Sequence, residues 1–174
     1  MKNKKKFFII LIVAIVIIAI AISAFFIFLH NSNANTPETA VQEFYNSLLP
    51  TYNAEKLEQS VGTKPYQLRF NDDGYFVNRY ERTREQIVYY YGEEFESTLS
   101  DFVLSDVNDV EKASIQREYS SKYSLQIEDY KKVSFSVTLS SEGREKSRTA
   151  VLTTLKIDGK WYVYDYDAYW FAYM

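Results

Sequence analysis

The side chains in this sequence that could do chemistry are mainly carboxylates and phenols. There are 23 Asp and Glu residues and 16 Tyr residues, but no Cys and a single His. The missing cysteines exclude a disulfide scaffold, a zinc–thiolate site and a thiol nucleophile. His30 lies just after a long apolar run, outside the predicted domain, so neither a Ser-His-Asp triad nor a histidine-bound metal is expected. We predict no catalytic, cofactor-binding or metal-binding residue.

One acidic run, Asn71-Asp72-Asp73-Gly74, has the composition of a calcium-binding loop. Aligning its glycine with the invariant glycine of such a loop places Arg69 at the first ligand position and Tyr80 at the last. Both positions require an acidic residue, so the match fails. We predict a turn here and no bound cofactor.

The beginning of the chain is typical of a membrane anchor. Met1–Lys6 contains four lysines, and Phe7–Leu29 contains no charged side chain. As a helix, this apolar run would be roughly 34 Å long, enough to cross a hydrocarbon core of about 30 Å. The lysines predict a cytoplasmic N-terminus, so the chain after His30 is expected outside the membrane. The lipid bilayer is therefore a predicted partner of residues 7–29.

A cleaved signal peptide is the alternative, with Ser32-Asn33-Ala34 as its cleavage site. The apolar region of a signal peptide is usually about 7–15 residues, and this one is longer. We predict four parts: a cytoplasmic tail, a transmembrane helix, a linker and one extracytoplasmic domain, at residues 1–6, 7–29, 30–35 and 36–174.

Charge distinguishes the predicted domain from the tail. Without the four lysines of residues 1–6, the chain has 16 basic and 23 acidic residues, a net charge of −7. Such a domain repels nucleic-acid phosphates, so no nucleic-acid partner is expected. The sequence leaves open whether the domain binds a protein partner or forms a homo-oligomer. An exported domain without disulfides fits a bacterial surface protein.

Helical signals dominate the first half of the predicted domain. Thr36 can cap a helix in which Pro37 takes the first position and which Pro50 ends. Asn53 can cap a second, short helix that Gly62 follows. The predicted helices cover residues 37–49, 54–60, 75–91 and 110–123, whereas residues 63–74 give no clear pattern.

Strand signals dominate the second half. Apolar and Ser/Thr residues alternate over Val133–Leu139, and Asp158-Gly159 is a typical hairpin turn. The predicted strands cover residues 95–107, 133–139, 148–157 and 160–165, with a hairpin loop at Ser140–Glu145. Helices segregated from an antiparallel sheet predict an α+β domain. In the last strand, Trp161 and Val163 are expected to join the core with Val137 and Val151.

Three stretches resemble exported bacterial members of the cystatin-like, nuclear-transport-factor-2-like superfamily. They are TPETAVQEFYNSLLPTYNAEKLEQSV at the start of the domain, YYYGEEFE before the first strand and KIDGKWYVYDYD at the closing hairpin. The resemblance covers roughly Thr36–Asp167. It implies a cone of helices packed on a strongly curved antiparallel sheet, often with a pocket between the two.

This fold hosts enzymes, binding modules and scaffold subunits, so the resemblance leaves function open. Its ketosteroid-isomerase-type enzymes use a pocket carboxylate and an oxyanion-stabilising phenol or acid, for which Asp101 with Tyr45 or Tyr162 is a candidate here. The inner-membrane scaffold subunit of type IV secretion systems is similar in having a short cytoplasmic tail, one membrane helix and an exported domain.

The tyrosine-rich end is the other candidate surface. Tyr162, Tyr164 and Tyr166 share one face of the last strand, which suits a cavity wall, an interface or simple cross-strand packing. An apolar tail, AYWFAYM, follows. Possible pocket or partner-surface residues are Tyr45, Tyr162, Tyr164, Tyr166 and Trp170. We expect a non-enzymatic binding or assembly module of the cell envelope; a secretion scaffold or an isomerase-type enzyme is the alternative.

Overall fold

The computed structural model of the chain describes residues 35–69 and 75–164, which lie in a compact unit that begins at Asn35. Five helices and four strands are described: α2 (Pro37–Leu48), α3 (Ala54–Val61), α4 (Thr63–Arg69), α5 (Tyr75–Tyr91), β1 (Glu96–Asp106), α6 (Asp109–Tyr123), β2 (Asp129–Ser141), β3 (Arg144–Ile157) and β4 (Lys160–Val163). The predicted tail, transmembrane helix and most of the linker fall outside these residues, as does the turn at 71–74. Among the described helices, none has both the length and the apolarity needed to span a bilayer.

The predicted helix starts are confirmed by their caps. The Thr36 hydroxyl accepts from the Thr39 N–H over 3.2 Å, and the Thr39 hydroxyl accepts from the Thr36 N–H in return. Asn53 accepts from the Lys56 N–H over 2.9 Å at the start of α3. These bonds satisfy backbone donors that the first turn of a helix leaves without partners. Sequence patterns gave no clear prediction for α4, which follows α3 after the single residue Gly62.

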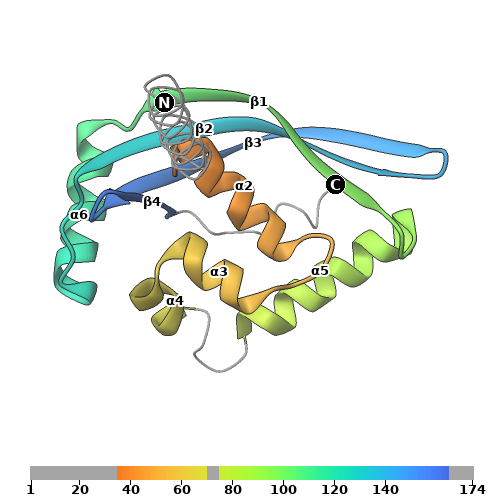
Figure 1. Cartoon of the computed structure of the whole chain (residues 1–174), viewed down its shortest axis with the longest axis horizontal. Helices are drawn as coiled ribbons and strands as arrows, with labels where there is room; N and C mark the ends of the chain where they lie inside the picture. Colours follow the sequence, from red (N-terminus) through yellow and green to blue (C-terminus); the bar gives the residue numbers. More distant parts are fainter. Residues whose placement is uncertain (1–34, 70–74, 165–174) are drawn as a thin grey trace, which may run out of the picture. The chain divides into compact units, whose positions relative to one another are not determined.

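The strands form one antiparallel meander in the order β1-β2-β3-β4, and the sheet curves over α2 and α3 (Figure 1). The β2–β3 pairing continues without a break to Ser141↔Arg144. The hairpin turn is therefore shorter than the predicted loop, and β3 starts four residues before the predicted strand. In β1, a bulge between Ser100 and Val103 explains the imperfect alternation of that segment.

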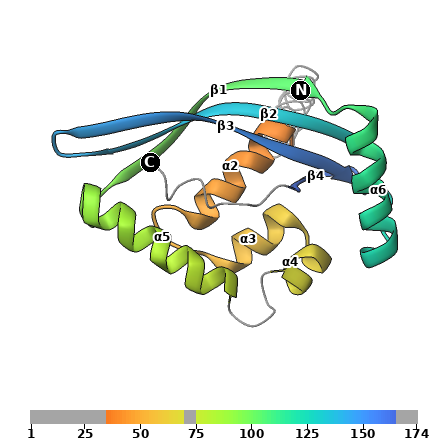
Figure 2. The same ribbon diagram turned by 180° about the vertical axis from the view of Figure 1, so that it is seen from behind.

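The two faces of the sheet carry separate apolar clusters. The inner-face cluster joins α2, α3 and α5 to alternate residues of β2, including Phe135 and Val137. The outer-face cluster joins Tyr119 and Tyr123 of α6 to Leu155 of β3. From the opposite view, α6 stands beside the end of the sheet that carries β4 (Figure 2). The fold is thus α+β, as predicted.

The last strand confirms one core prediction and corrects another. Trp161 and Val163 are buried, and Val163 belongs to the inner-face cluster with Val137. Val151 does not join them, because it pairs with Ser134 on the outer face and is 55% exposed. The cause is the limited reach of α6, which covers the outer face of β3 from Thr153 to Ile157 and leaves Val151 beyond it.

Candidate functional site

Tyr45, a predicted surface candidate, lies inside the domain. Its side chain is buried between α2 and β2, with its ring edge-on to Phe135 at 5.2 Å between centroids. Burial raises the pKa of the Tyr45 hydroxyl well above its ordinary value, because the phenolate would lose its hydration. The position is that of a core residue that fills the space under the sheet.

The candidate pairs of Asp101 with a tyrosine are not assembled in this structure. Asp101 is exposed at the bulge of β1, where the Ser100 hydroxyl donates to its carboxylate over 2.9 Å. Tyr45 belongs to the inner-face cluster and Tyr162 packs against the outer-face cluster. A carboxylate in solvent and two phenols on opposite sheet faces do not form one pocket.

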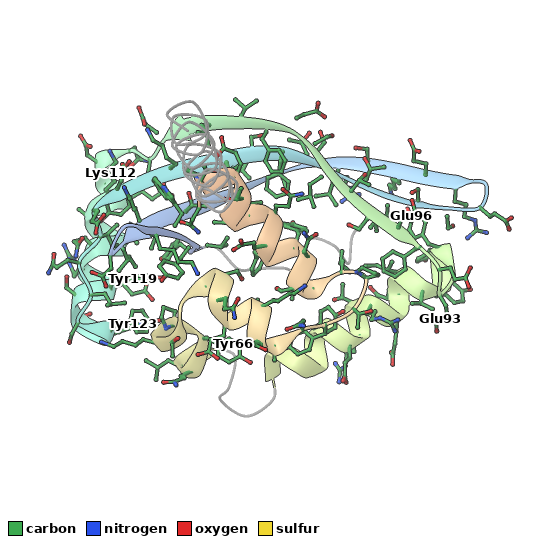
Figure 3. The ribbon with its side chains drawn as sticks, in the orientation of Figure 1. Tyr66, Glu93, Glu96, Lys112, Tyr119 and Tyr123 are labelled. Atoms are coloured by element: carbon green, nitrogen blue, oxygen red, sulfur yellow. The ribbon has the colours of Figure 1, made fainter. Side chains whose placement is uncertain are left out.

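Tyr162 and Tyr164 both pack against the outer-face cluster. The Tyr164 ring lies 5.9 Å from that of Tyr119, and its hydroxyl donates to Glu118 over 3.0 Å. Tyr119 and Tyr123 are neighbours along α6 (Figure 3). Helix packing accounts for Tyr164, whereas Tyr162 also borders an open cleft. Tyr166 and Trp170 lie outside the described residues.

The cleft beside Tyr162 has a volume of about 190 Å³. It lies where the α3–α4 junction, the segment after α6 and the β3–β4 turn meet. Its walls combine apolar side chains with one cation, one anion and one phenol, and the lining residues are Val61, Gly62, Thr63, Lys64, Pro65, Leu125, Ile157, Asp158 and Tyr162. An apolar cleft with a few converging polar groups is the usual form of a small-ligand site.

Hydrogen bonds between distant segments hold the walls in place. The Lys64 ammonium donates to the Tyr123 carbonyl oxygen at the end of α6 over 2.8 Å. The Gly159 N–H donates to Glu128 over 3.0 Å, which fixes the β3–β4 turn. The Lys160 ammonium donates to the Gln59 carbonyl oxygen over 3.2 Å. The cleft is therefore formed before any ligand arrives, which lowers the cost of binding.

Burial and a nearby negative charge together favour the protonated form of Tyr162. Partial burial raises the pKa of its hydroxyl, and the negative charge of Asp158 raises that pKa further. The Lys160 ammonium lies 5.3 Å from the centre of the Tyr162 ring, in a cation–π contact. The cleft thus presents a neutral phenol, the Asp158 carboxylate and the Lys64 ammonium around an apolar floor.

Gly62 forms the α3–α4 junction beside the Tyr162 ring. Its φ of +88° is a conformation that side chains with a Cβ rarely adopt. An added Cβ would meet the Tyr162 ring at 3.5 Å. Since 3.5 Å is an ordinary van der Waals contact, the positive φ and not the space beside the ring favours glycine at this junction.

The predicted candidates include Tyr162 but not the charged residues beside it. Lys64 and Asp158 come from segments far apart in the chain, and a single sequence does not show that they meet. The hairpin signal Asp158-Gly159 indicates a turn and nothing more. Among the described residues, no group of three or more His, Cys, Asp or Glu side chains could hold a metal ion.

Comparison of the chain with protein-family models, curated proteins and solved structures gives no match.

Proposed function

We propose that this protein is a membrane-anchored extracytoplasmic binding module of the bacterial cell envelope. The uncharged run Phe7–Leu29 and the lysines before it support a single membrane crossing with the N-terminus in the cytoplasm. A protein with this arrangement carries its folded domain outside the membrane, where it meets ligands or partners of the envelope.

We also propose that the domain is of the cystatin-like, nuclear-transport-factor-2-like class. The arrangement of α2 and α3 against one face of a curved antiparallel sheet supports this assignment. The helix pair and the closing hairpin come from two of the segments that carry the resemblance. The exposed position of Asp101 favours a binding function over the isomerase-type alternative, which needs its carboxylate in a pocket.

The preformed cleft beside Tyr162 is the observation that carries the binding function. The Lys64 ammonium suits a carboxylate, the Asp158 carboxylate suits an ammonium, and the apolar floor suits a short aliphatic group. A ligand with all three features is an apolar amino acid or the end of a short apolar peptide. The ligand class of the proposed module is therefore a zwitterion with an aliphatic side chain.

Three matched probes test this function on the full chain in phospholipid nanodiscs. Leucine carries both charges, 4-methylpentanoate lacks the ammonium and 3-methylbutylamine lacks the carboxylate. A charged hydrogen bond contributes about 1.5 kcal/mol at the low end of its range, which applies here because Lys64 and Asp158 are exposed, so leucine should bind about tenfold more tightly than either analogue. Isothermal titration measures the three affinities.

Two substitutions assign the charges to their residues. Lys64→Gln removes the cation that faces the carboxylate, so leucine should lose its advantage over 3-methylbutylamine. Its advantage over 4-methylpentanoate should remain. Asp158→Asn should remove the advantage over 4-methylpentanoate only, and Asn tolerates the positive φ of this turn. Lys56→Gln, at an exposed lysine outside the cleft, is the control. Failure of leucine to bind wild-type protein saturably, or equal binding of all three probes, would contradict the proposal.

A further inference from the structure

The exposed face of α5 carries two neighbouring tyrosines far from the cleft. Tyr89 is 81% exposed and Tyr90 is 58% exposed. Their rings lie edge to face, with 5.2 Å between centroids. This end of α5, beside Glu93, lies at the opposite side of the described domain from Tyr119 and Tyr123 of α6 (Figure 3). The tyrosine pair is therefore a separate feature from the Tyr162 cleft.

The two rings border a shallow surface hollow with a volume of about 480 Å³. Its other lining residues are Arg82, Glu85 and Gln86, which occupy the same side of the helix at spacings of three and four residues. Within the described part of the chain, no hydrogen bond or ion pair engages the side chains of these three residues. The guanidinium and carboxylate in the hollow thus provide a planar donor and a planar acceptor beside the two tyrosine rings, and the glutamine provides an amide.

The backbone under this hollow is fixed. The Arg144 guanidinium at the tip of the β2–β3 hairpin donates to the Tyr90 carbonyl oxygen. On the other side of the helix, Ile87 is buried in the inner-face cluster. The rings are therefore presented on a helix whose position is set by both the hairpin and the core.

We propose that this surface binds a neutral glycan chain. A tyrosine ring can cover the C–H face of a pyranose ring, while guanidinium, carboxylate and amide groups hydrogen-bond to its hydroxyl groups. The core of a protein interface is mainly apolar, whereas the lining surface of this hollow is mainly polar, which favours a polyhydroxyl ligand over a protein. The net charge of −7 beyond residue 6 disfavours anionic polymers.

Cellohexaose and chitohexaose are suitable probes, because both are neutral chains of pyranose rings. The full chain is used in phospholipid nanodiscs, since glycoside detergents would compete for the same surface. Wild-type protein should bind at least one probe saturably. Tyr89→Ala should weaken that binding by about tenfold, the loss expected for one stacked ring, and Tyr89→Phe should retain most of it.

Two control variants show whether glycan binding depends on this surface alone. Val110→Ala removes an equally exposed side chain from α6 and should leave glycan affinity unchanged. Lys64→Gln should also leave it unchanged, so failure of the cleft proposal and failure of this one are distinguishable. Absence of saturable glycan binding, or equal affinities of wild type and Tyr89→Ala, would overturn the inference. So would exclusive crosslinking of a photoreactive residue at position 86 to a protein in cells.

Discussion

The side-chain amide of Asn35 forms two hydrogen bonds with the backbone of Trp161. Its Nδ2 donates to the Trp161 carbonyl oxygen over 3.2 Å, and its Oδ1 accepts from the Trp161 N–H. The second bonding edge of β4 has no neighbouring strand in the four-stranded order, so Trp161 would otherwise present free backbone groups there. One side chain at the start of the domain thus satisfies both groups and fastens that start to the final strand.

Replacing Asn35 with alanine should destabilise the domain. Two backbone groups of Trp161 would lose their partners in a half-buried site, which should reduce the free energy of unfolding by about 1–3 kcal/mol. Urea denaturation followed by tryptophan fluorescence measures this change. Asn35→Asp keeps the acceptor and loses the donor, so it should lie between wild type and Asn35→Ala. Equal stability of all three proteins would show that the amide contributes nothing.

Alkaline pH should unfold the domain through its buried tyrosines. Burial raises the pKa of Tyr45, so the folded state holds this proton after the unfolded state has released it. The contribution is fully present below about pH 10 and is lost as pH rises through the folded-state pKa. Tyr45 should therefore lower the free energy of unfolding by up to about 1.4 kcal/mol per pH unit above pH 10.

Urea titrations at several pH values above and below the ordinary tyrosine pKa measure that slope. Tyr45→Phe keeps the ring against Phe135 and removes the titrating hydroxyl, so its slope should be shallower than that of wild type. Tyr89→Phe, at an exposed tyrosine, should reproduce the wild-type slope. Identical slopes for wild type and Tyr45→Phe would contradict the assignment of this effect to Tyr45.

The absence of native cysteine makes the membrane topology directly testable. Val110 is 83% exposed, so a cysteine there should be tolerated and should react with a membrane-impermeant maleimide in intact cells. Asn3→Cys, in the predicted cytoplasmic tail, should react only after permeabilisation. Labelling of position 3 but not of position 110 in intact cells would reverse the proposed orientation.

Sequence patterns predicted the elements that carry strong local signals. Thr36 and Asn53 cap helices, and the alternation over β2 has one buried face, so these elements were predicted within a few residues. The distal part of the β2–β3 hairpin was missed because residues 144–149 are exposed on both faces, and the ladder of backbone hydrogen bonds alone defines it. Val151 was misplaced because the outer face of β3 is exposed at Val151 and becomes buried only from Thr153 onward, where α6 covers it.

The candidate site was predictable only in part. The tyrosine-rich last strand drew attention to Tyr162, since aromatic residues there had to meet a cavity, a partner or a helix. Its charged neighbours Lys64 and Asp158 reach the cleft through tertiary packing, by the bond of Lys64 to the end of α6 and by the turn that places Asp158. A sequence pattern with a local period carries no information about which residues from distant segments come into contact.

The most direct test of the central claim, that the cleft beside Tyr162 is a binding site, is to fill it. Thr63 lines the cleft and is exposed, so Thr63→Trp should occupy the space without disturbing the core. Thr98→Trp, at an exposed position of β1, is the matched control. Isothermal titration with leucine should give saturable binding for wild type and Thr98→Trp, and affinity at least about tenfold weaker for Thr63→Trp. Equal leucine affinities of all three proteins would contradict the claim.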